Sequence, residues 1–121
     1  MARILLVDDA PDVREMISDF LKLEGYEVVT AANGLEALEM MEQKNPDAAI
    51  VDIEMPEMNG LEFARRVLSK NPDFPMVIIS AYVEKYSMEY ISQIGVKNIL
   101  RKPINLNELS RYIKQLTDHQ K

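Results

Sequence analysis

The chain has 121 residues and a net charge of -6, with 14 lysine and arginine residues against 20 aspartate and glutamate residues. Because the basic residues do not form a stripe, direct nucleic-acid binding is disfavoured. It has no cysteine and one histidine, His119 in the polar tail, which excludes disulfides and thiolate chemistry and argues against a histidine-ligated metal or a Ser-His-Asp triad. The length indicates one domain, and because no apolar run approaches the roughly 20 residues that span a bilayer, we expect a cytoplasmic protein without membrane contact.

The N-terminal stretch predicts a buried strand, an acidic loop and a helix. Residues 3–7 form a run without polar alternation, which is typical of a parallel strand covered by helices on both faces. Asp8 and Asp9 end this run abruptly. Pro11 suits the first turn of a helix, and apolar residues at helical spacing extend that helix to Gly25, a residue type that favours a helix end.

A second short strand is expected at residues 28–31, and Asn33 opens the next helix. Asn33-Gly34 is also a hairpin signal, but the apolar residues after it recur at helical spacing and Glu36 stands where a capping box requires it. The same Asn-Gly-Leu-Glu pattern recurs at residues 59–62. It indicates two helices with similar caps rather than a repeat protein.

The third strand carries a carboxylate at its last position. Residues 48–51 are an unbroken apolar run, Asp52 follows them, and Met55-Pro56 then breaks the strand. In open parallel sheets, ligands bind outside the carboxyl ends of the strands. Asp52 is therefore placed for chemistry rather than for packing.

The C-terminal half continues the alternation of strands and helices. Residues 76–80 are predicted as a strand, residues 84–94 as a helix, and residues 99–101 as a short strand that Lys102 follows. A last helix opens at Asn105, which has capping chemistry.

Five strands alternating with five helices predict an α/β fold, a three-layer doubly wound sandwich with helices on both faces of a parallel sheet. Parallel strands present their carboxyl ends at one edge. The residues expected to converge there are Asp8, Asp9, Asp52, Ser80 and Lys102.

This set of side chains suits phosphoryl transfer. Two carboxylates about 4 Å apart repel by about 4 kcal/mol at an effective dielectric of about 20, so three of them need a compensating cation, and hard oxygen ligands favour Mg²⁺. Lys102 adds a positive charge and Ser80 a hydroxyl donor. A carboxylate nucleophile in such a site can accept and hold a phosphoryl group, and the product at Asp52 would be an aspartyl phosphate.

At these residues the sequence resembles the receiver domains of bacterial two-component response regulators. The shared motifs stand in the family's order and cover nearly the whole chain. They are Leu5-Leu6-Val7-Asp8-Asp9, Asp52 with Met55-Pro56 and Gly60, Ser80-Ala81, and Lys102-Pro103. The resemblance implies a flavodoxin-like (CheY-like) five-stranded sheet of order 2-1-3-4-5 and a single receiver domain over residues 1–121.

The resemblance also implies a role for each residue of the site. Asp52 would be the phosphoacceptor, and Lys102 would contact the phosphoryl oxygens. Ser80 would be the switch hydroxyl, assisted by the amide of Ala81. The ligands implied for Mg²⁺ are Asp8 (through water), Asp9, Asp52 and the main-chain carbonyl of Glu54.

Such a domain is a signalling switch rather than an enzyme, since it catalyses only its own phosphorylation and autodephosphorylation. The implied phosphoryl donor is a sensor histidine kinase or a phosphotransfer protein. The implied target is a downstream protein or a linked effector domain. No effector domain follows the last helix, which indicates either a stand-alone receiver or a domain of a larger regulator.

The implied output surface lies on the helix at 84–94, the strand at 99–101 and the last helix, and it could also form a homodimer contact. The side chains expected to be exposed there are Lys85, Met88, Ile99 and Tyr112. Ile99 departs from the family, which commonly has an aromatic at this position, so we expect a weaker coupling to the site. Tyr82, Tyr86 and Tyr90 recur at helical spacing and are interpreted as a partly buried helix flank.

Two other functions fit parts of the pattern. A Mg²⁺-dependent phosphatase of the haloacid dehalogenase kind also uses a strand-end aspartate, and Glu54 has the offset of its general acid. That nucleophile belongs on the first strand, however, and the cap domain is missing. Flavin binding on the same fold is opposed because Asp8, Asp9 and Asp12 would repel an FMN phosphate.

Asp12 is interpreted as an acid that favours the start of a helix rather than as a fourth ligand of the metal.

Overall fold

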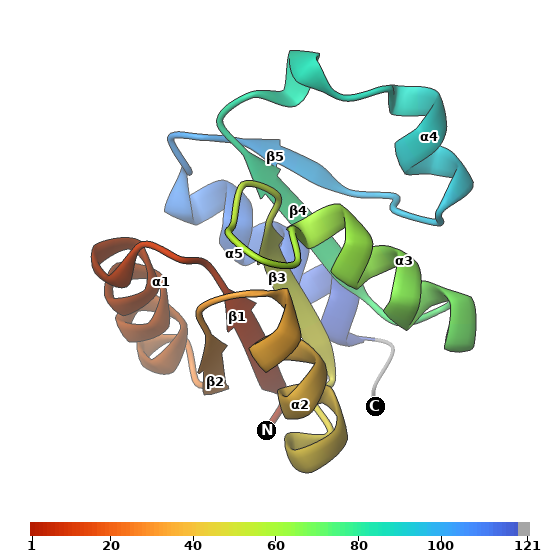
Figure 1. Cartoon of the computed structure of the whole chain (residues 1–121). Helices are drawn as coiled ribbons and strands as arrows, with labels where there is room; N and C mark the ends of the chain where they lie inside the picture. Colours follow the sequence, from red (N-terminus) through yellow and green to blue (C-terminus); the bar gives the residue numbers. More distant parts are fainter. Residues whose placement is uncertain (119–121) are drawn as a thin grey trace.

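The computed structural model describes residues 1–118, and its elements alternate as predicted (Figure 1). His119 lies outside the described residues. The strands are β1 (Arg3–Val7), β2 (Glu27–Ala31), β3 (Ala48–Asp52), β4 (Met76–Ser80) and β5 (Ile99–Arg101). The helices are α1 (Pro11–Leu23), α2 (Gly34–Lys44), α3 (Gly60–Lys70), α4 (Met88–Gln93) and α5 (Leu106–Asp118), with a turn of 3-10 helix, η1 (Val83–Lys85). Within residues 1–118, no helix has the length and apolar character that crossing a membrane requires.

The five strands form one parallel sheet of order β2-β1-β3-β4-β5. This confirms both the predicted fold class and the strand order. β1 lies between two partners, and its Leu5 is opposite Val29 on one side and Ala49 on the other. The carboxyl ends of all five strands therefore point the same way.

Alternate residues of the central strands enter two different cores, one on each face of the sheet. On β1, Leu5 and Val7 belong to the core that also holds residues of α2, α3 and α4, whereas Ile4 and Leu6 belong to the core shared with α1 and α5. Figure 1 shows these helices on the two sides of the sheet. Burying one large aliphatic side chain stabilises the fold by about 1.5–3 kcal/mol. The two cores therefore fix the position of the central strands, whose carboxyl ends lie at one edge of the sheet.

Three asparagines cap helices as predicted. The side-chain oxygens of Asn33, Asn59 and Asn105 each accept a hydrogen bond from the backbone N–H three residues later, at 2.9, 3.0 and 3.0 Å. Each bond satisfies one of the free N–H groups at a helix N-terminus. These caps explain why α2, α3 and α5 begin where they do.

The helix predicted over residues 84–94 is wrong in its extent, because it is two separate elements. The turn η1 ends at Lys85, and α4 begins only at Met88. Ser87 lies between them, and its Oγ accepts a hydrogen bond of 3.1 Å from the N–H of Tyr90. A serine cap starts a helix, so a new helix begins where the apolar spacing alone indicated a continuous one.

The predicted tyrosine flank is therefore also wrong, since no single helix runs through these three residues. Tyr82 precedes η1, Tyr86 lies between η1 and α4, and Tyr90 is in α4. Tyr82 and Tyr90 are exposed, but Tyr86 is half-buried and packs against the core beneath α2, α3 and α4.

The expected output surface is less exposed than predicted. Lys85 and Met88 are exposed, as expected. Ile99 and Tyr112 are half-buried and pack against the cores on opposite faces of the sheet. Their positions in the sheet and in an amphipathic helix explain this, because each presents part of its side chain to the interior.

Candidate functional site

The strand ends bring charged and polar side chains together at one edge of the sheet, as predicted. Asp8 follows β1, Asp52 is the last residue of β3, Ser80 is the last residue of β4 and Lys102 follows β5. This is the edge at which open parallel sheets bind ligands. We therefore take it as the candidate functional site.

Three acids form a cluster at this edge. One carboxylate oxygen from each of Asp8, Asp9 and Asp52 lies within 4.8 Å of the others. Asp8 and Asp52 are buried and Asp9 is exposed. Asp12 belongs to the first turn of α1 and is not part of this group, which agrees with its interpretation as a helix-start acid.

The two oxygens of Asp52 have different surroundings. Oδ2 faces Lys102, but Oδ1 is buried without a hydrogen-bond partner among the described residues. A buried oxygen with no donor is costly, and a cation that bound there would remove the cost. Three carboxylates with such an oxygen among them are a donor set that fits a small hard cation such as Mg²⁺.

Lys102 brings a positive charge to the acid cluster. Its Nζ lies 3.3 Å from Oδ2 of Asp8 and 3.3 Å from Oδ2 of Asp52. Burial, followed by the charge of Asp8, raises the pKa of Asp52 to about 6, against the lowering effect of Lys102. Burial disfavours the charged form of Lys102, yet Asp52 and Asp8 together raise its pKa above the ordinary value. The lysine therefore offsets only part of the negative charge.

Gly60 holds the loop after β3 against Asp52. Its N–H donates to the carbonyl of Ile53 at 3.0 Å. A Cβ at this position would lie 2.2 Å from the carbonyl oxygen of Asp52, so the close approach requires glycine. The start of α3 thus packs directly on the backbone that carries the candidate nucleophile.

The side chain of Glu54 makes contacts that the sequence did not predict. Its Oε2 accepts hydrogen bonds from the hydroxyls of Ser80 and Tyr86, each at 2.7 Å, and its Oε1 accepts one of 3.2 Å from the N–H of Ala81. Burial and the neighbouring Glu54 raise the pKa of Tyr86 to about 12, so its hydroxyl stays protonated at neutral pH and can donate. Tyr86 is 32 residues from Glu54, and no local sequence signal marks it.

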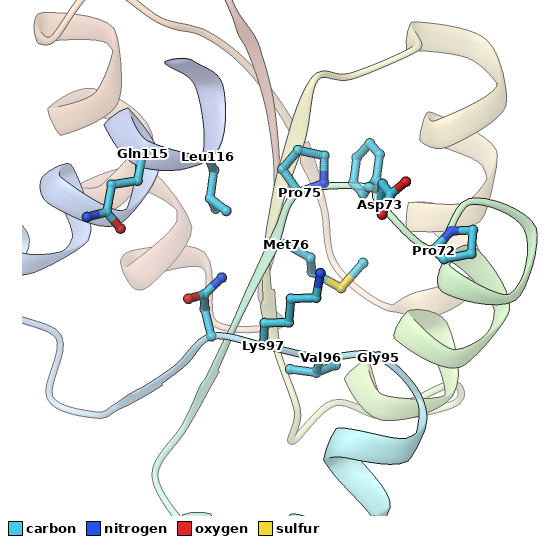
Figure 2. A pocket seen from close by; sticks show the side chains of 11 residues that line it. Pro72, Asp73, Pro75, Met76, Gly95, Val96, Lys97, Gln115 and Leu116 are labelled. Carbon is cyan, nitrogen blue, oxygen red and sulfur yellow. The ribbon is translucent and has the colours of Figure 1, made fainter. Parts of the chain in front are cut away.

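A recess of about 300 Å³ lies at the opposite edge of the sheet. Figure 2 shows that it is formed by the loop before β4, the loop before β5 and the last turns of α5. Among residues 1–118, Asp73 and Lys97 are the only ionisable ones that line it. One acid and one lysine do not form a catalytic or metal-binding group of side chains, so the strand-end cluster remains the candidate site.

Comparisons with known proteins agree with this geometry. A family model described as the response regulator receiver domain matches residues 4–114. Sporulation initiation phosphotransferase F of Bacillus subtilis (strain 168) is 29% identical over 113 residues, which are 93% of this chain and 91% of that protein. Regulatory protein AtoC of Escherichia coli (strain K12) is 34% identical over 113 residues, which are 93% of this chain but 24% of that protein.

A solved structure is similar over almost the whole chain. It is the crystal structure of response regulator protein TrrA from Thermotoga maritima in complex with Mg²⁺-BeF, with a TM-score of 0.87 and 39% sequence identity. The match covers 96% of this chain and 99% of that one. The chain therefore spans nearly all of two of these relatives and about a quarter of the third.

Proposed function

The chain belongs to the family of response regulator receiver domains, and from this premise we propose that Asp52 is the residue that accepts its phosphoryl group. The observation that carries this assignment is the position of Asp52. Its carboxylate is buried at the end of β3, lies 3.3 Å from Nζ of Lys102 and is grouped with Asp8 and Asp9. A signalling switch of a two-component system needs a nucleophile in such surroundings.

The reaction is a transfer from nitrogen to oxygen. A carboxylate oxygen of Asp52 attacks the phosphorus of a phosphohistidine on a sensor histidine kinase or a phosphotransfer protein. The O–P bond forms as the N–P bond breaks, and the leaving imidazole takes up a proton from solvent. The product is an acyl phosphate, whose later hydrolysis restores the carboxylate. The chain thus catalyses only its own phosphorylation and autodephosphorylation.

Asp9 and Asp52 would bind Mg²⁺ directly, Asp8 would do so through water, and the main-chain carbonyl of Glu54 would complete the protein ligands. The acid cluster and the unpartnered Oδ1 of Asp52 support this set. Bound Mg²⁺ supplies neutralisation of the negative charge on the phosphoryl oxygens. The TrrA structure contains Mg²⁺-BeF, and its likeness to this chain supports the same cofactor here.

The phosphoryl oxygens would be held by Lys102, by the hydroxyl of Ser80 and by the N–H of Ala81. A hydrogen bond to a doubly charged phosphoryl group is stronger than one to a neutral acceptor, so phosphorylation would draw Ser80 toward Asp52. The space left behind Ser80 lies next to β5. We place the resulting output surface on α4, β5 and α5, where a downstream protein, a linked effector domain or a second copy of the chain would bind.

Residues 1–121 are proposed to act as one receiver domain in the cytoplasm. The test of the function is modification by acetyl phosphate, or by fluoroberyllate, in the presence of Mg²⁺. Wild type and an Asp73→Asn control should be modified, and Asp52→Asn should not be. Modification of Asp52→Asn at the wild-type level would refute the assignment. Hydrolysis of an added phosphomonoester would instead indicate the phosphatase alternative.

A further inference from the structure

The carboxylate of Glu54 is held by three hydrogen-bond donors. Two of them, the hydroxyl of Ser80 and the N–H of Ala81, belong to adjacent residues at the end of β4, at 2.7 and 3.2 Å. The third is the hydroxyl of Tyr86, also at 2.7 Å. Glu54 is half-buried, so water screens these bonds less than it would at an exposed site.

Two of these donors are the groups proposed above to bind a phosphoryl oxygen at Asp52. A hydroxyl hydrogen can be donated to only one acceptor at a time, and the hydroxyl of Ser80 already donates to Glu54. A carboxylate and a phosphoryl group are both anions, and like charges this close repel each other. Glu54 and a phosphoryl group at Asp52 therefore compete for the same two donors.

Tyr86 has a different position from the other two donors. It lies between η1 and α4, where its N–H donates to the carbonyl of Val83 at 3.2 Å. The next residue, Ser87, is the cap of α4. The hydroxyl of Tyr86 thus joins the loop after β3 to the segment that leads into α4, and a change at Glu54 reaches this segment directly.

We propose that Glu54 is an internal anion that occupies the phosphoryl-binding donors in the unphosphorylated protein, and that Tyr86 is the positioning residue that holds it there. Phosphorylation must displace the Glu54 side chain from Ser80 and Ala81, and the displaced carboxylate no longer accepts from Tyr86. The site is thereby coupled to the segment before α4 by a route that does not use Ile99. This inference rests on the proposed function, because it concerns the donors of the phosphoryl group.

The decisive variant is Tyr86→Phe, because it removes one hydroxyl and leaves all charges unchanged. We measure the affinity for fluoroberyllate at saturating Mg²⁺, with Tyr90→Phe as the control from the same region. Tyr86→Phe should bind about tenfold more tightly than wild type, the effect expected when one hydrogen bond to a charged group is lost from the competing state. Tyr90→Phe should match wild type. Unchanged or weaker binding by Tyr86→Phe would overturn the proposal.

The second step asks whether Tyr86 acts through Glu54. Glu54→Ala removes the side chain and keeps the main-chain carbonyl, and it should also tighten fluoroberyllate binding. Adding Tyr86→Phe to Glu54→Ala should then change the affinity by less than about twofold, because coupled residues are not additive. A further tenfold effect in the double variant would show that Tyr86 acts by another route, and the proposal would be wrong.

A third measurement uses no ligand and so separates this inference from the proposed function. In the free protein, Glu54→Ala should shift the amide signal of Ala81 and the ring signals of Tyr86 in NMR spectra. Glu57→Ala, at a neighbouring exposed acid, should leave both in place. Unmoved signals in Glu54→Ala would overturn the proposal that Glu54 is the internal anion, even if wild type binds fluoroberyllate. Failure of wild type to bind fluoroberyllate with Mg²⁺ would refute the proposed function, and the shifts in the free protein would still decide whether Glu54 holds these donors.

Discussion

Lys102 and Asp52 come from different strand ends, yet Nζ of Lys102 lies 3.3 Å from Oδ2 of Asp52. The same nitrogen is 3.3 Å from Oδ2 of Asp8. One ammonium group thus contacts two buried carboxylates. It is positioned to stabilise negative charge that arrives at Asp52, whose other carboxylate oxygen, Oδ1, has no hydrogen-bond partner among the described residues.

Replacing Lys102 should therefore slow phosphorylation. Lys102→Met should lower the rate of modification by acetyl phosphate by about 100-fold, the loss typical when one preorganised donor to a developing charge is removed. Lys102→Arg should recover part of the rate, because it keeps the charge but changes the donor geometry. Lys97→Met, at the opposite edge of the sheet, is the matched control. An equal rate in Lys102→Met and Lys97→Met would remove the role assigned to Lys102.

The raised pKa of Asp52 predicts a pH dependence of stability in the absence of divalent cations. The pKa is about 6 in the folded protein against an ordinary value of 3.8, so the folded state binds this proton more tightly than the unfolded chain. The contribution of Asp52 to stability is therefore greatest below about pH 4 and is lost as the pH rises through about 6. A shift of this size corresponds to about 3 kcal/mol.

Asp52→Asn removes this dependence. The free energy of unfolding of Asp52→Asn minus that of wild type should be about 2–3 kcal/mol larger at pH 7.5 than at pH 4. Both free energies are measured by urea denaturation in EDTA. Asp73→Asn, an exposed acid on a loop, should differ from wild type by the same amount at both pH values. A pH-independent difference for Asp52→Asn would contradict the raised pKa.

Mg²⁺ should stabilise the folded protein through the acid cluster. A ligand that binds only the folded state at a hundredfold excess over its Kd adds about 2.7 kcal/mol, so the melting temperature should rise measurably. Asp9→Ala should lose this rise and Asp12→Ala should keep it, because Asp9 belongs to the cluster and Asp12 does not. Equal shifts in the two variants would show that the cation binds elsewhere.

Gly60→Ala should damage both the fold and the site. The new Cβ would lie 2.2 Å from the carbonyl oxygen of Asp52, and the backbone must move to relieve this contact. We expect a loss of about 2 kcal/mol or more in the free energy of unfolding, together with slower modification of Asp52. Ser69→Ala, on the exposed end of the same helix, is the control. Wild-type stability in Gly60→Ala would show that the loop has room for a side chain.

The sheet and the residues at its edge were predictable from local patterns in the amino-acid sequence. Strands buried on both faces appear as unbroken apolar runs, and their ends are visible where Asp8, Asp52 and Lys102 follow those runs. The caps at Asn33 and Asn59 were equally predictable, because each is a hydrogen bond to an N–H three residues away. These features depend on neighbours in the chain, so the sequence alone is sufficient to recognise them.

The split of the predicted 84–94 helix shows where local patterns compete. The apolar spacing favours one helix, but the cap at Ser87 favours a new start. Tyr86, just before this cap, has an extended backbone, and its hydroxyl donates to Glu54. The spacing carries no information about that last contact. Its energy comes from Glu54, which lies in the loop after β3.

The contacts of the Glu54 side chain, in contrast, depend on how the chain folds. The family resemblance assigned Glu54 only a main-chain carbonyl at the metal site, and no hydrogen-bond partner was predicted for its carboxylate. In the folded protein that carboxylate accepts from Ser80 and Tyr86, which are 26 and 32 residues away. No pattern of neighbouring residues encodes such bonds, because they form only when the sheet brings the end of β3 beside the end of β4. The carboxylate of Glu54 then lies against donors that need a hydrogen-bond acceptor.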